Sequence, residues 1–85
     1  MQRVKPPYIK PPTPLFHYRL ATVSGPQAAI RMENALRERL TGLRLSYFAI
    51  GHEGGSYDVM GDSGTSPLAD DDLRAAQAVA AQITP

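Results

Sequence analysis

A short glycine-containing loop between two strand-like stretches constrains this fold more than any other feature of the sequence. Residues 43–50 and 56–61 are largely apolar and partly alternating, and the segment between them, Gly51–Gly55, contains three glycines. Such a short connection between two stretches of this kind is typical of a β-hairpin. The two stretches are therefore predicted to be neighbouring antiparallel strands.

An earlier strand is predicted over residues 15–24, where side chains alternate with a period of two. One face is expected to carry Phe16, Tyr18, Leu20 and Thr22, and the other His17, Arg19, Ala21 and Val23. The later half of 43–50 differs, because residues 47–50 are apolar on both faces. We therefore expect that end of the strand to be buried on both sides or to meet a partner.

Two helices are predicted from their starts and from the spacing of apolar residues. Ser24-Gly25-Pro26 and Ser66-Pro67 place a cap residue before a proline, which the first helical turn tolerates. The first helix is expected to end at Gly42, and Asp70–Asp72 are expected in or near the first turn of the second. The predicted apolar stripes are Ala29, Met32, Leu36, Leu40 and Leu43 in one helix, and Leu73, Ala76, Val79 or Ala80, and Ile83 in the other.

The resulting order, β-α-β-β-α, predicts an α+β fold of two layers, with both helices on one face of a three-stranded sheet. A right-handed crossover would make the first two strands parallel and the hairpin would add an antiparallel third, so the sheet is expected to be mixed. This order resembles a ferredoxin-like split βαβ unit without its last strand. The resemblance implies an unpaired outer edge on the first strand, where a second subunit, a partner or the N-terminal segment could add a strand.

Residues 1–14 form a proline-rich segment in front of the single domain predicted for residues 15–85. Lys-Pro-Pro occurs at 5–7 and again at 10–12, so this arm is expected to be extended and largely polyproline II. It would serve either as a ligand for an aromatic groove or as a brace along its own domain or a dimer partner.

Composition limits the classes of function. The chain of 85 residues has room for one modest core, and it contains no cysteine for disulfides, thiolate metal sites or nucleophiles. Residues 1–44 hold eight of the nine Lys and Arg residues and two acids, so the second half is acidic. That asymmetry fits either a charged partner or complementary faces of one fold. With no long apolar run and prolines near the start, we expect a cytoplasmic protein without a membrane span.

Sequence signals for an enzyme are weak, and we predict none. Residues 61–64, Gly-Asp-Ser-Gly, match the nucleophile sequence of chymotrypsin-like proteases, but those enzymes need two β-barrels that this chain cannot build. His52 and Glu53, with Asp58 or Asp62, match no known metal spacing. No catalytic residue, cofactor or metal is expected.

The sheet face away from the helices is the predicted interaction surface. Partner-binding residues are expected to be Arg19, Arg44, Phe48, Ile50 and Met60, with Tyr8 from the arm, and Val23 is expected in the same apolar patch. The predicted function is that of a small non-enzymatic regulator that acts by protein contact through the open face or an edge of its sheet, as a homodimer. Seven arginines against two lysines, with eleven alanines, suit a bacterial or phage gene. Nucleic-acid binding through the basic half is the alternative, and a small-molecule sensor is a third class.

Overall fold

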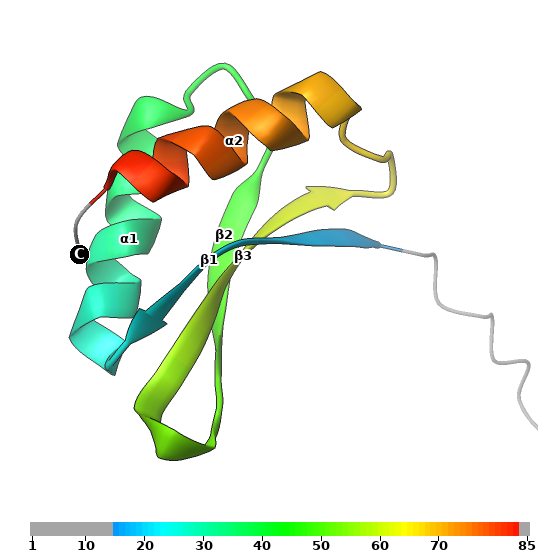
Figure 1. Ribbon diagram of the computed structural model, residues 1–85. Helices are drawn as coiled ribbons and strands as arrows, with labels where there is room; N and C mark the ends of the chain where they lie inside the picture. Colours follow the sequence, from blue (N-terminus) through cyan, green and yellow to red (C-terminus); the bar gives the residue numbers. More distant parts are fainter. Residues whose placement is uncertain (1–14, 84–85) are drawn as a thin grey trace, which may run out of the picture.

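The computed structural model describes residues 15–83, which form three strands and two α-helices in one α+β unit (Figure 1). The elements in chain order are β1 (Phe16–Ser24), α1 (Pro26–Arg39), β2 (Ser46–Gly51), the 3₁₀ turn η1 (Glu53–Gly55), β3 (Ser56–Gly64) and α2 (Asp70–Gln82). The β-α-β-β-α order agrees with the prediction from the sequence. The proline-rich arm lies outside the described residues.

The sheet has the strand order β1-β3-β2, and both of its ladders are antiparallel. The prediction of a mixed sheet was wrong. β1 and β2 run in the same direction, but β3 returns from the hairpin between them, so the two parallel strands never exchange hydrogen bonds. β3 is therefore the central strand, and its registers on both sides decide which side chains share a face.

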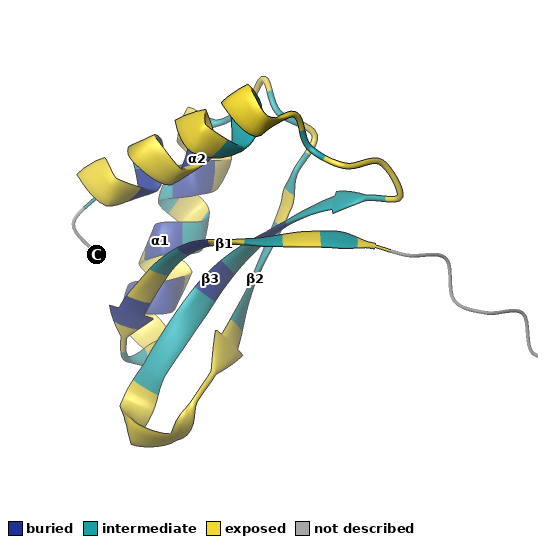
Figure 2. Cartoon of the chain, turned by 45° about the vertical axis from the view of Figure 1, so that its right-hand side comes forward, coloured by how far each residue is buried: buried dark blue, intermediate teal, exposed yellow. Residues whose placement is uncertain are grey.

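Both helices lie on one side of the sheet, where the core is (Figures 1 and 2). Leu36 of α1 and Val59 of β3 are completely buried, and Ala76 and Ala80 bring α2 close to the same cluster. Alanines on the buried face of a helix permit close packing against the sheet. Because both helices lie on the same side, no element among residues 15–83 covers the other face of the sheet (Figure 1).

The start of α1 is fixed by Gly25, whose φ of 89° lies in the left-handed region that favours glycine. Its N–H donates a 2.8 Å hydrogen bond to the carbonyl of Gly55 at the hairpin tip, and Pro26 follows in the first turn. α2 begins at Asp70, later than the predicted cap at Ser66. The Ser66 carbonyl accepts a bond from Ser63 Oγ, which holds this segment as a loop.

A register shift in β1 changes which side chains face the core. The pairing with β3 moves by one residue between Arg19 and Ala21, which is the signature of a β-bulge. Leu20 and Val23 are consequently both buried in the core, whereas strict alternation had placed them on opposite faces. The predicted place of Val23 in an apolar patch on the uncovered face is therefore wrong.

Candidate interaction surface

We call the uncovered side of the sheet the open face, and the strand registers arrange its side chains in three rows. Each row takes one residue from β1, β3 and β2 in turn: His17–Asp62–Ser46, Arg19–Met60–Phe48 and Thr22–Asp58–Ile50. The alternate residues on β3, which are Tyr57, Val59 and Gly61, lie on the covered side. The open face thus has polar side chains in its two outer rows, at Asp62 and Asp58, and the apolar pair Met60 and Phe48 in the row between them.

The middle of the open face is apolar. Phe48 and Met60 are directly opposite each other across the β2–β3 ladder, and Ile50 is 43% exposed in the next row. The ring of His17 contacts Phe48 edge-on, with centroids 5.1 Å apart and planes at 72°. Such edge-to-face packing holds the phenyl ring in place without burying it.

Asp58 anchors the polar groups at the hairpin end of the open face. Its carboxylate accepts a 2.7 Å hydrogen bond from Thr22 Oγ1 of β1 and lies 2.8 Å from Nε2 of His52 at the hairpin tip. The hydrogen bond from Thr22, which has the larger effect, and the contact with His52 hold the pKa of Asp58 below its ordinary value. One carboxylate therefore ties β1, β3 and the loop together.

A second His–Asp pair lies at the other end of β3. His17 Nε2 is 3.5 Å from Asp62, and the same carboxylate accepts a 2.7 Å bond from the backbone N–H of Gly64. Asp58 and Asp62 are four residues apart on one strand, or about 13 Å. The two histidines therefore belong to separate pairs.

Among residues 15–83, the Gly-Asp-Ser-Gly sequence is not part of a serine–histidine–aspartate arrangement like that of chymotrypsin-like proteases. His17 pairs with Asp62, and the hydroxyl of Ser63 donates to the Ser66 carbonyl. Within residues 15–83 no three histidine or acidic side chains come together as metal ligands. In the same span, no helix has the length and apolar character needed to cross a membrane.

Four of the six predicted partner-binding residues lie together on the open face: Arg19, Phe48, Ile50 and Met60. Arg44 is exposed but precedes β2, and it lines a cavity of about 570 Å³ with Ser66 and Asp72. Tyr8 lies outside the described residues. Sequence reasoning missed the Thr22–Asp58–His52 group, because the bulge that turns Thr22 outward has no signal in the alternation.

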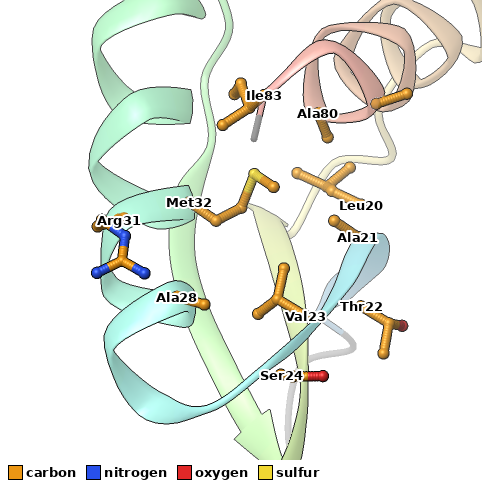
Figure 3. A pocket seen from close by; sticks show the side chains of 11 residues that line it. Leu20, Ala21, Thr22, Val23, Ser24, Ala28, Arg31, Met32, Ala80 and Ile83 are labelled. Carbon is orange, nitrogen blue, oxygen red and sulfur yellow. The ribbon is translucent and has the colours of Figure 1, made fainter. Parts of the chain in front are cut away.

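A groove of about 630 Å³ opens at the edge of β1, between α1 and α2 (Figure 3). Five consecutive residues of β1, 20–24, line it, so the groove follows the strand rather than one of its faces. Met32 from α1, Ala80 from α2 and Ile83, which directly follows α2, complete the apolar part of its wall. Residues 15–83 thus leave the core incompletely closed on the side of β1.

Comparison with protein-family models, with curated proteins and with solved structures gave no match for this chain. The open face and the β1 edge are the two surfaces of the described residues from which a function can be inferred.

Proposed function

We propose that the protein is a small non-enzymatic binding module that acts by protein–protein contact through the open face, as a homodimer. The observation that carries the proposal is the apolar group of Phe48, Met60 and Ile50, which extends from the middle row to the hairpin-end row of a sheet face that neither helix covers (Figure 1). A partly exposed apolar centre with a polar rim is the usual anatomy of a protein interface.

The polar rim of the open face supports the same proposal. Asp58 and Asp62 are each engaged by neighbours on the sheet, so the rim is arranged before a partner arrives. Arg19 is exposed in the same row as Met60 and Phe48. Met60 lies between Arg19 and Phe48 in that row, and arginine is one of the residue types enriched in interface hot spots.

The strand order also supports the finer description of the fold as a split βαβ unit that lacks its last strand. In such a unit the third strand is inserted between the first two, as β3 is here. The missing strand would lie beside β1. This description implies no function by itself, but it marks the two surfaces available for contact, the open face and the β1 edge.

Affinity capture from a lysate of the source organism tests the proposal, with three forms of the protein as bait. Phe48→Glu places a charge at the middle of the open face, and Ile30→Glu makes the same kind of change at an apolar residue of α1 that is 55% exposed. We expect the wild type and Ile30→Glu to capture the same protein and Phe48→Glu to lose it. Equal capture by all three forms would exclude the open face as the contact surface.

Nucleic-acid binding is the second candidate, because Arg19 lies in the same row as Phe48 and Arg44 is also exposed. Arginine and one aromatic ring could hold a single strand by phosphate contact and stacking. Asp58 and Asp62 on the same face oppose this reading. Fluorescence anisotropy with single- and double-stranded oligonucleotides at about 50 mM salt, where phosphate contacts are strong, decides the matter. No binding there excludes it.

A further inference from the structure

The outer edge of β1 is an open pairing site. β1 exchanges backbone hydrogen bonds with β3 on one side, and no strand among residues 15–83 lies on its other side. The strand is nine residues long, contains no proline or lysine, and has Arg19 as its only Arg, Lys, Asp or Glu side chain. The length and composition of β1 suit pairing with another chain, and the features that can still protect its edge are the two register shifts, between Phe16 and His17 and between Arg19 and Ala21.

The groove beside this edge indicates what an added strand needs. Its wall from Met32, Ala80 and Ile83 calls for apolar side chains on the helix side of the new strand (Figure 3). The alternate residues of the new strand would extend the open face and would be exposed to water. The new strand must also have free N–H groups at alternate positions to bond with β1.

The arm at residues 1–14 does not meet these requirements. Prolines occur as adjacent pairs at 6–7 and 11–12. Whichever alternate set of residues faced β1, each pair would place one proline where an N–H donor is needed. A ladder built from this segment would therefore lack at least two of its donors.

β1 itself has the required pattern. Tyr18, Leu20 and Val23 belong to the core side of the strand, and His17 and Thr22 belong to the open face. It contains no proline in Phe16–Ser24. A second copy of β1 therefore offers a proline-free edge. Its pairing is irregular at the bulge between Arg19 and Ala21, where the Arg19 carbonyl also accepts a 3.2 Å bond from Gln77 Nε2 of α2.

We propose that two copies of the protein pair through β1, antiparallel and about a two-fold axis perpendicular to the sheet. The inference deepens the homodimer of the proposed function and places its contact at this edge. The two sheets then form one continuous sheet of six strands, in the order β2-β3-β1-β1-β3-β2. Each copy supplies the last strand that the other lacks.

This arrangement also closes the groove. Under such an axis the helices of both copies lie on one side of the sheet, so the two grooves face each other. Ala80 and Ala81 on α2 are small enough for the α2 helices to approach, and Ile83 gains an apolar neighbour. Both open faces then lie on the other side and form one surface of double width.

Spin labels test the position of the contact. The chain contains no cysteine, so Thr22→Cys and Ile50→Cys each provide a single labelling site. Thr22 and Ile50 share one row of the sheet. We take the register in which this row lies at the two-fold axis. The two β1 strands are then one strand spacing apart, or about 5 Å at residue 22, and the two β2 strands are five spacings apart, or about 24 Å at residue 50.

We expect a shorter label-to-label distance at residue 22 than at residue 50 in any register, because a shift along the strands lengthens both. A shorter distance at residue 50 would overturn the proposal in favour of contact through β2 or the open face. A monomer mass in analytical ultracentrifugation at every concentration up to about the millimolar range, where even weak complexes associate, would also overturn it.

A matched pair of variants on α2 gives a second test. Ala81 is exposed and lines the groove, whereas Ala78 is exposed and does not. Ala81→Glu puts two like charges near the two-fold axis, so we expect the dimer to weaken at least about tenfold while Ala78→Glu leaves it unchanged. Circular dichroism verifies that both variants keep the fold. Unchanged dimerisation of Ala81→Glu would count against the β1 contact.

The failure of this inference is distinguishable from the failure of the proposed function. Phe48→Glu should keep the dimer and lose the captured protein, and Ala81→Glu should lose the dimer. A dimer insensitive to Ala81→Glu, with capture still dependent on Phe48, refutes only the β1 contact. A dimer through β1 with capture independent of Phe48 refutes only the role of the open face.

Discussion

The two faces of the sheet are made by the same three strands, yet they are organised in different ways. On the covered face, Val59 is completely buried and Leu36 of α1 fills the space above the sheet. On the open face, polar contacts around Asp58 and Asp62 enclose a small apolar centre. The covered face therefore accounts for most of the stability of the fold, and the open face has side chains available for recognition.

The largest expected difference between the faces is in the cost of removing an apolar side chain. Leu36→Ala leaves a cavity in the core, because Leu36 is fully buried, and should lower the free energy of unfolding by about 2–5 kcal/mol. Ile50→Ala on the open face should cost less than about 1 kcal/mol. Urea unfolding followed by circular dichroism measures both. Similar losses would mean that the two faces contribute alike.

The second largest difference in stability between the two faces is expected when a larger side chain is introduced on each. A Cβ at Gly61 would lie 3.1 Å from Leu20 Cδ1 and 3.4 Å from Leu45 Cδ2. Gly61→Val should therefore overpack the core and cost about 1–3 kcal/mol. Ser46→Val is the matched control, since Ser46 is exposed in the neighbouring row of the open face and has room for the larger side chain. A Gly61→Val variant as stable as Ser46→Val would contradict tight packing at this point.

The sequence predicted the helices and strands correctly in order but did not predict which strands pair in the sheet. Alternation and helical spacing indicate which residues share a face, and they were sufficient for the order of strands and helices. They do not specify which strands exchange hydrogen bonds, so the insertion of β3 between β1 and β2 was missed. The bulge near Leu20 was missed for a related reason, because one extra residue reverses the faces beyond it without changing the composition.

The candidate site was predictable to the same extent. Phe48, Ile50 and Met60 follow from simple alternation in the hairpin, and all three lie on the open face. The contact of Thr22 with Asp58 joins residues 36 positions apart and depends on both the bulge and the strand order. Contacts of this kind follow from tertiary structure and have no local sequence signal.

The acid stability of the open face should depend on Asp58. Its pKa is lowered in the folded state from an ordinary value of 3.8, through the bonds from Thr22 and His52. The carboxylate therefore stabilises the fold above that value, and this contribution is lost as the pH falls through the folded pKa. Unfolding measured from about pH 6 down to about pH 3 spans the ordinary range of aspartate.

Asp58→Asn should flatten this part of the pH profile, because asparagine does not titrate. Asp71→Asn is the control, since the Asp71 side chain is 98% exposed and lies 3.5 Å from Arg74 on the same helix. We expect the control to follow the wild-type profile. Identical profiles for all three proteins would show that the contacts of Asp58 do not couple its titration to folding.

The smallest effect is expected from the hydroxyl of Tyr47, on the covered side of β2. This oxygen is buried and has no hydrogen-bond partner among residues 15–83, and burial raises its pKa, opposed in part by Arg37. Tyr47→Phe removes an unsatisfied polar atom, so stability should stay the same or rise by up to about 1 kcal/mol. Tyr18→Phe is the matched comparison, because the Tyr18 hydroxyl accepts a 3.0 Å bond from the N–H of Leu68. That variant leaves the N–H unpaired and should lose about 1 kcal/mol, so equal losses for the two tyrosines would contradict the difference between their hydroxyls.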